Sequence, residues 1–375
     1  MSLLFRIVYA AHATGTHHKL ALALRLLTIP DTVLFFLIFM LHAELYMQGS
    51  KAPDNEFKDF KNHVLHVRDG YWGGALGKAE KWYGELTATL ARGDWEQAVW
   101  CAGVLSHYVT DPVQPFHTGQ SEAENSIHRA AEWSISKSYD DLRAQGLENG
   151  APFVITTNDN ATWLRELVLS GAEKANVHYE TLIAHYDLHK GVSDPPAGLD
   201  AMSRKILGDL VVHAAAAFAA VRDRAFAESG CEPPEVTLAL DTVLAAVKIP
   251  AKTLAKRLAD AEDRRIVTAM YDELTNTGRV DATLPEDDRV VRDLYAKEVE
   301  APRLAERAAL RTAILSAPAT PPAPIARLKP AEQPVAASSA KHYLALSDDI
   351  ERAPTIGPRT AQRLQPLGVK SVADF

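Results

Sequence analysis

The sequence has few cysteines and no long hydrophobic run. Its 375 residues contain two cysteines, Cys101 and Cys231, too few for a disulfide framework, so a reducing compartment is permitted. The longest apolar run, 33–41, follows Pro30 and Asp31. Because a membrane-spanning helix needs about twenty apolar residues, this run is too short to cross a bilayer. It predicts instead a buried helix or, alternatively, a patch that approaches a lipid interface.

The sequence also lacks an excess of positive charge. Its formal net charge is −8, with 40 lysines and arginines against 48 aspartates and glutamates. Since binding to duplex DNA depends largely on clustered cationic side chains, a general polyanion-binding surface is not expected. A metal-centred phosphodiesterase remains compatible with this composition, because bound metal ions supply local positive charge.

Apolar residues recur at helical spacing through most of the chain. One example is the series Met202, Ile206, Leu210, Ala214 and Phe218. No stretch shows the sustained alternation of apolar and polar residues that is typical of a half-buried strand. The sequence therefore predicts an all-α fold.

Composition divides the chain into four parts. Residues 1–229 are predicted to form a helical domain, and a Gly- and Pro-containing break separates it from a helical extension at 230–315. Residues 316–340 are rich in proline and alanine, which is typical of a semi-rigid linker. Residues 341–375 are then expected to form a separate small module.

Five potential metal ligands lie close together in the first domain. They are His107, Asp111 and His117 in HYVTDPVQPFH, and His128 and Glu132 in HRAAE. A spacing of four residues places a histidine and a carboxylate on one face of a helix, and it occurs twice here. Nitrogen and oxygen ligands without a thiolate favour zinc, or alternatively manganese or iron, in a site with open coordination positions.

The helix that would carry the first pair has recognisable ends. Asp94 is a candidate N-cap with Gln97 three residues later, and the apolar residues that follow predict a buried helix over 94–110. Pro112 and Pro115 are expected to end the helix in an extended turn that brings His117 back toward its last turn. A second helix, beginning near residue 125 or 126, would carry His128 and Glu132.

In this order of residues the chain resembles the bacterial zinc-dependent phospholipases C and the related fungal single-strand nucleases. That family has HxxxD, a histidine after a proline-containing turn and HxxxE, on an all-helical domain with a cluster of three metals. Its upstream aspartate and histidine correspond to Asp54 with either His66 or His63, and we favour His66. Its histidine near the amino terminus corresponds to His17 or His18, of which we favour His17.

The resemblance implies a zinc-dependent phosphodiester hydrolase, phospholipase C-like, in which a metal-bound hydroxide attacks the phosphorus. Asp54 would orient or deprotonate the attacking water. By similarity, Asp54, His66 and His107 hold one zinc ion, Asp111 bridges it to the ion bound by His17, and His117, His128 and Glu132 hold another.

The amino terminus departs from the family pattern. Secreted members use an N-terminal tryptophan as a ligand of the third metal, whereas this chain has Met1 and no tryptophan near His17. Either His12 takes its place or the site holds two metals only. Residues 1–13 have one arginine and a short apolar core, a poor match to a secretory signal, so a cytoplasmic location is expected.

The expected substrate is a phospholipid, and a nuclease or another phosphodiesterase is the alternative. The alternative is favoured by IERAPTIGPRTAQRLQPLGVKSVADF, which resembles a helix-hairpin-helix unit turning at Gly357. Backbone amides at such a turn can bind a phosphate, so this module could bind nucleic acid, or a protein. Thr355 replaces the usual second glycine, and the chain stops at Phe375, where a further helix is expected. A third hypothesis is a non-catalytic metal-bound scaffold.

Overall fold

The computed structural model describes residues 15–21, 42–152, 154–232, 249–316 and 371. His12, the apolar run at 33–41, and all but residues 316 and 371 of the predicted linker and C-terminal module lie outside the described residues. Within the described residues, no helix combines the length and the apolar character needed to span a membrane.

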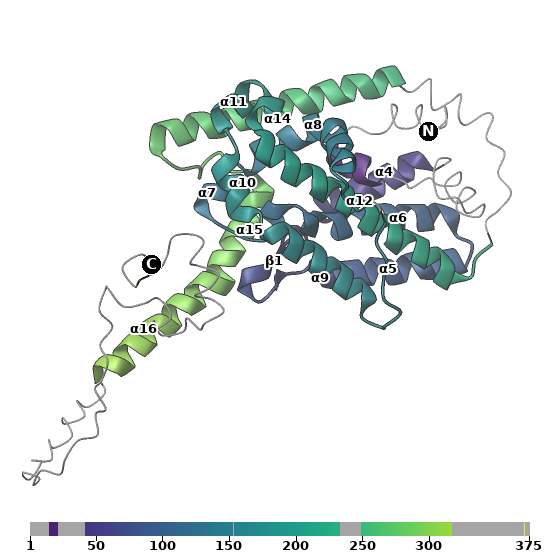
Figure 1. The fold of residues 1–375 in the computed structure, drawn as a ribbon, viewed down its shortest axis with the longest axis horizontal. Coiled ribbons are helices and arrows are strands. Elements are labelled where there is room, and N and C mark those ends of the chain that lie inside the picture. Colours follow the sequence, from purple (N-terminus) through teal and green to yellow (C-terminus); the bar gives the residue numbers. More distant parts are fainter. Residues whose placement is uncertain (1–14, 22–41, 153, 233–248, 317–370, 372–375) are drawn as a thin grey trace, which may run out of the picture. The chain divides into compact units, whose positions relative to one another are not determined.

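The fold is mainly helical, which confirms the predicted all-α class (Figure 1). The strands of the described part are β1 (Leu65–His66) and β2 (Trp72–Gly73), which pair antiparallel with His66 opposite Trp72. The α-helices are α2 (Thr16–Ala21), α4 (Ala43–Ala52), α5 (Ala75–Ala91), α6 (Trp95–Thr110), α7 (Glu122–Asn125), α8 (His128–Glu148), α9 (Trp163–Asn176), α10 (Tyr179–His185), α11 (Leu188–Ser193), α12 (Ala201–Ser229), α14 (Ile249–Thr277), α15 (Glu286–Tyr295) and α16 (Ala301–Ser316). Short π-helical or 3-10 turns are η1 (Pro53–Phe57), η2 (Phe60–Asn62), η3 (Val67–Asp69), η4 (Asp111–Val113), η5 (Pro115–His117), η6 (Pro195–Gly198) and η7 (Ala296–Glu300).

Helix α6 is the central element of the motif-bearing region, and it packs against α4 and α5. The side chain of Asp94 accepts a hydrogen bond from the backbone N–H of Gln97, as the sequence predicts, and from Ala98 onward the helix is almost wholly buried. Helices α4 and α6 approach closely at two glycines. A Cβ at Gly49 would lie 2.3 Å from the carbonyl oxygen of Trp100, so neither helix could keep its place if this residue carried a side chain.

Helix α8 packs against the long helix α12, and their apolar residues form a second core. Gly146 of α8 faces Gly208 of α12, where a Cβ at Gly146 would lie 2.2 Å from the carbonyl oxygen of Gly208. The start of α8 at His128 places the HRAAE motif in the first two turns of a helix, a few residues later than the predicted start. The two motif-bearing helices α6 and α8 are thus held by separate cores.

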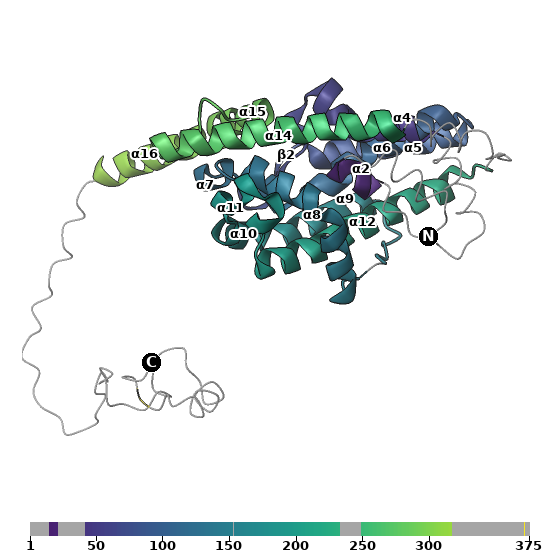
Figure 2. The same cartoon turned by 90° about the horizontal axis from the view of Figure 1, so that it is seen from above.

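By its internal contacts the chain divides into two units, Met1–Thr312 and Ala313–Phe375. The predicted helical domain and nearly all of the predicted helical extension belong to the first unit. Within this unit α14 packs on α8 and α11, and α15 packs on the turn η2, and Figure 2 shows α14 as a long helix along one side of the other helices. The finer division between residues 229 and 230 stays a prediction.

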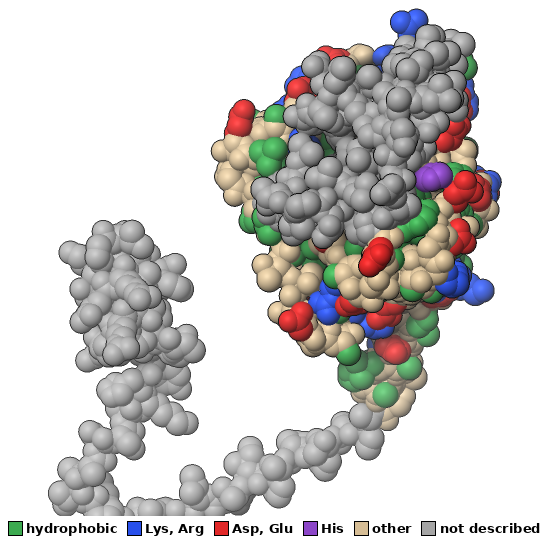
Figure 3. Space-filling model, turned by 90° about the vertical axis from the view of Figure 1, so that its right-hand side faces the viewer, with side chains coloured by type: hydrophobic (Ala, Val, Ile, Leu, Met, Phe, Trp, Pro, Cys, Tyr) green, Lys and Arg blue, Asp and Glu red, His purple; other side chains and the backbone are tan. Residues whose placement is uncertain are grey.

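The charged side chains of the first unit are mixed in sign on the face that Figure 3 shows. Acidic and basic side chains lie interspersed there among the described residues.

Candidate metal centre

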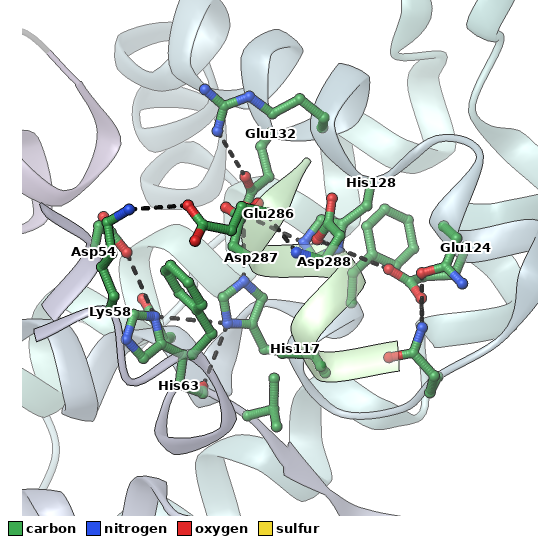
Figure 4. Close-up of a pocket in the computed structure, with 18 of the residues that line it drawn as sticks. Asp54, Lys58, His63, His117, Glu124, His128, Glu132, Glu286, Asp287 and Asp288 are labelled. Atoms are coloured by element: carbon green, nitrogen blue, oxygen red, sulfur yellow. Dashed lines mark hydrogen bonds and ion pairs between the residues drawn. The ribbon is translucent and has the colours of Figure 1, made fainter. Parts of the chain in front are cut away.

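The histidines and carboxylates of the predicted site come from five segments and meet at one cavity of about 450 Å³ in the first unit. The segments are α2, the α4–η1 junction, the turn after η2, the C-terminal end of α6 with its two 3-10 turns, and the first turns of α8. Figure 4 shows side chains from these segments pointing toward one another around the cavity. Three sets of three such residues have ligand-type atoms that all lie within 4.8 Å of one another.

The two deeper sets share His107 and form what we call the inner group: His17, Asp54, His63, His107 and Asp111. Oδ2 of Asp111 lies 2.9 Å from Nε2 of His107 and 3.6 Å from Nδ1 of His63, and Oδ1 of Asp111 lies 3.4 Å from Nδ1 of His17. Oδ1 of Asp54 lies 3.4 Å from Nδ1 of His63 and 3.5 Å from Nε2 of His107. Two carboxylates therefore face the same three imidazoles.

The third set is the outer group, which consists of His117, His128 and Glu132. Oε1 of Glu132 lies 3.3 Å from Nε2 of both histidines. Asp111 joins the two groups, because its Oδ2 also lies 3.6 Å from Nδ1 of His117. The turn that places His117 there consists of the 3-10 turns η4 and η5, rather than the extended segment that the sequence predicts.

Backbone and carboxylate acceptors fix the orientation of the inner histidines. Nδ1 of His107 donates a hydrogen bond to the carbonyl oxygen of Ser50, at 3.0 Å, so Nε2 is left to face the carboxylates. Nε2 of His63 lies 3.3 Å from Oδ1 of Asp59, which also accepts a hydrogen bond from Tyr108. Such outer partners are typical of histidines that bind metals.

The geometry favours His63 over His66, against the preference from the sequence. His66 is fully buried but belongs to none of the three sets; its ring lies 4.8 Å from that of Trp72 and 5.2 Å from that of Tyr295. The cause is local, because His66 belongs to β1 and pairs with Trp72, which directs its side chain into an aromatic cluster. His17 on α2 belongs to one of the three sets, whereas the neighbouring His18 belongs to none of them.

Burial and neighbouring charges have opposite effects on the pKa values of His107 and Asp111 in the inner group. Burial disfavours the charged imidazole of His107, but Asp111 and Asp54 outweigh this effect and raise its pKa to about 9. Burial likewise opposes ionisation of Asp111, yet His107, His17 and His117 hold its pKa well below the usual range. For His17, burial and the neighbouring His107 lower the pKa to about 3. The two carboxylates thus stay ionised, with a proton on His107 balancing part of their charge.

The outer group shows the same arrangement. Burial opposes the charge on His128, but Asp288, Glu132 and Glu124 raise its pKa well above 6.5. Burial also opposes the charge on Glu132, but His128 and His117 hold its pKa well below 4.5. In the absence of a metal, protonated histidines neutralise the carboxylates; a divalent cation can do so in their place.

The donor set fits a divalent metal. Among the described residues, Nδ1 of His17, Oδ2 of Asp111 and Nε2 of His128 are buried and make no hydrogen bond of normal geometry, although each faces other ligand-type atoms. Buried polar atoms normally have hydrogen-bond partners, so such atoms gathered at one place call for an explanation. Imidazole and carboxylate are the ligands that zinc uses in sites with open coordination positions.

Several residues of the site escaped the sequence analysis. Asp59 lies four residues before His63, and Glu124 lies four residues before His128, with its Oε1 2.7 Å from Nδ1 of that histidine. The four-residue spacing was a usable signal for Glu124, whereas Asp59 lies among short turns. Lys51, whose Nζ lies 3.1 Å from Oδ2 of Asp54, and Asp288 of α15 had no such signal.

Fold and site together define an all-α protein with three sets of His, Asp and Glu residues that could hold metal ions. No protein-family model matches the sequence, and a search of curated proteins finds no significant match.

Proposed function

We propose that this protein is a zinc-dependent phosphodiester hydrolase of the phospholipase C type. The observation that carries the proposal is the pair of adjacent ligand groups joined by Asp111. Two neighbouring metal sites that share a carboxylate are typical of enzymes that hydrolyse phosphate esters. The order of the ligands along the chain, which resembles the zinc-dependent phospholipases C and single-strand nucleases, supports the same class.

The inner group would hold one or two zinc ions and the outer group one more. Bound zinc supplies Lewis acidity to a phosphodiester and to a water molecule. The protein supplies the rest of the site. Asp54, whose side chain is 31% exposed at the cavity, is placed to orient a water molecule, and Lys51 and the neighbouring histidines hold the pKa of its carboxyl well below the usual range. Lys58 and Arg129 also line the cavity, where cationic side chains attract an anionic substrate.

A phospholipid is the proposed substrate. Phe60, Phe116 and Val291 give the cavity an apolar part beside its ionised part, which suits a phosphodiester that carries an apolar portion. Nucleic acid is the second candidate, because the family resemblance includes nucleases. Zinc as the metal, a cytoplasmic location and a helix-hairpin-helix module at 341–375 stay predictions.

The proposal is tested by counting zinc and measuring hydrolysis on the same preparations. Elemental analysis of the full chain is paired with hydrolysis of bis-nitrophenyl phosphate by wild type and by Asp111→Asn. Asp159→Asn, in which a fully exposed carboxylate is changed, is the matched control. The proposal expects about two or three zinc ions per chain, with turnover lost in Asp111→Asn and kept in the control.

Two other results would contradict the proposal. One zinc ion or none, with no turnover, would remove the enzyme hypothesis. Full zinc loading without turnover of any phosphodiester would support a non-catalytic scaffold instead. With active protein in hand, phosphatidylcholine vesicles and single-stranded DNA, offered under identical conditions, separate the two candidate substrates.

A further inference from the structure

The predicted helical extension reaches the metal centre. The first turn of α15 carries Glu286, Asp287 and Asp288, and all three line the same cavity as the inner and outer groups. Figure 4 shows Asp288 beside His128, whereas Glu286 points toward Lys58. The extension has no metal-ligand motif of its own, so its contribution is visible only in the fold.

Several contacts fix α15 to the motif-bearing region. Val291 packs with Phe60 and Val64 in a small apolar cluster. At the end of the helix, the hydroxyl of Tyr295 donates a hydrogen bond to Oδ2 of Asp69, at 3.1 Å. At its start, Oε2 of Glu286 lies 2.9 Å from Nζ of Lys58. Helix α15 is therefore fixed at both of its ends, which keeps its first turn at the cavity.

Helix α14, which precedes α15, is attached to α8 beside the outer group. A guanidinium nitrogen of Arg129 donates to Oδ1 of Asp263 at 2.6 Å, and Nε1 of Trp133 donates to Oδ1 of Asp260 at 2.8 Å. Arg129 and Trp133 flank Glu132 on α8. The extension thus contacts the outer group through α15 and the neighbouring residues of α8 through α14.

The contacts of His128 divide between its two ring nitrogens. Nε2 lies 3.3 Å from Oε1 of Glu132, its partner in the outer group. Nδ1 lies 2.7 Å from Oε1 of Glu124 and 3.1 Å from Oδ1 of Asp288. Of the three acidic residues in the first turn of α15, Asp288 alone has a described ion pair with His128; Glu286 pairs with Lys58.

We propose that Asp288 is a positioning residue of the metal centre. It holds Nδ1 of His128, together with Glu124, so that Nε2 stays directed at Glu132 and His117. Carboxylates that bind the outer nitrogen of a ligating histidine fix its orientation and increase its basicity, and their loss typically weakens metal binding about 10- to 100-fold. The inference rests on the proposed function, because it assigns the outer group to a metal.

A direct ligand role for Asp288 fits the geometry less well. The set of atoms within 4.8 Å of one another contains His117, His128 and Glu132 but not Asp288. The contact of Asp288 is with Nδ1 of His128, whereas the contact of Glu132 is with Nε2. Asp288 therefore lies on the opposite side of the His128 imidazole from Glu132. The extension is then a part of the metal centre.

The test uses the full chain with Asp288→Ala and Asp288→Asn. Asp293→Ala is the matched control, because Asp293 lies on the same helix and pairs only with Arg292 among the described contacts. The readouts are zinc per chain and the rate at which a chelator removes each ion. We expect one ion to dissociate about 10- to 100-fold faster in Asp288→Ala, with the remaining zinc unchanged. Asp288→Asn, which keeps an oxygen acceptor, should fall between Asp288→Ala and wild type.

The possible outcomes distinguish failure of the proposed function from failure of the role assigned to Asp288. If wild type binds no zinc, the proposed function fails and this inference fails with it. If wild type binds zinc and both Asp288 variants release it at the wild-type rate, the inference alone is overturned. A merely structural role would lower the melting temperature without selective loss of one ion. Should Asp288→Ala fail to fold, the nearly isosteric Asp288→Asn still gives the comparison.

Discussion

The inner and outer groups contain the same kinds of side chain, but the protein surrounds them differently. Each group has one carboxylate that is partly exposed at the cavity, Asp54 in the inner group at 31% and Glu132 in the outer group at 33%, and His107 of the inner group is fully buried. The inner group depends largely on packing between α4 and α6, and the outer group depends on α8 with contacts from the distant helix α15. The comparison teaches that helices of the motif-bearing region assemble the inner group, whereas the outer group also depends on a contact from the predicted extension.

The largest effect is expected from His107→Ala, because His107 belongs to both sets of the inner group. The change removes a ligand and leaves Asp111 and Asp54 buried with less compensating charge. We expect loss of the inner zinc, and loss of about 3 kcal/mol in the free energy of unfolding of the metal-free protein. Elemental analysis and denaturant unfolding measure the two effects.

Glu132→Gln is the matching change in the outer group. It should remove only the outer ion, because the inner ligands do not depend on Glu132. Equal zinc loss in the two variants would show that the groups are one cooperative site. Full retention of zinc in His107→Ala would refute the assignment of the inner group.

The next largest effect is the difference in zinc binding between His63→Ala and His66→Ala. His63→Ala should weaken zinc binding by about 10-fold or more, since His63 faces both inner carboxylates. His66→Ala should leave zinc binding unchanged and lower the free energy of unfolding by about 2 kcal/mol, because it opens a cavity beside Trp72 and Tyr295. Chelator competition and thermal unfolding on both variants give the answer, and the reverse pattern would restore His66 as the ligand.

Zinc binding should also depend on pH. In the metal-free protein the pKa of His107 is raised to about 9, so below that pH a zinc ion must displace a proton from its ring. The apparent affinity should therefore rise about tenfold per pH unit for each proton displaced, between pH 7 and 9. The metal-free protein should show the opposite trend, because a raised histidine pKa stabilises the fold fully below about pH 6.5 and this stabilisation is lost as the pH rises through 9.

Chelator competition across this range, with the chelator's own titration subtracted, measures the effect on affinity. An affinity independent of pH from 7 to 9 would mean that no proton leaves the inner group. Unfolding of the metal-free protein at the same pH values provides the second trend.

The smallest effect is expected from Asp94→Ala. Asp94 caps the N-terminus of α6, at the opposite end from His107, and its side chain accepts one hydrogen bond, at 3.3 Å, from the backbone of Gln97. Its loss should cost about 1 kcal/mol in the free energy of unfolding. Zinc content should not change, and a drop in zinc would mean that the position of α6 along its axis controls the inner group.

The sequence predicted the parts of the site that depend on helical spacing. His107 with Asp111, and His128 with Glu132, are four residues apart on or at the end of a helix, so their common face follows from the backbone period. His63 could not be chosen over His66 in this way. The segment around them is a series of short turns, with Lys58 at a positive φ of 48°, and no period relates side-chain direction to residue number there.

Asp288 could not be predicted at all. It lies in a helix that reads as an ordinary amphipathic segment, and only tertiary packing brings it to His128. The all-α class was predictable because helical periodicity is a property of each segment by itself. The contribution of the extension to the site is a property of how segments pack.

The most direct test of the central claim is X-ray diffraction from zinc-loaded crystals, with anomalous differences measured at the zinc absorption edge. The account predicts separate anomalous peaks at the inner and outer groups. Each peak should lie about 2.0 to 2.2 Å from the nitrogen and oxygen atoms of its own ligands, with His63 in the inner group and His128 in the outer one. Crystals without a zinc peak at either group, or with zinc bound at His66 instead of His63, would contradict it.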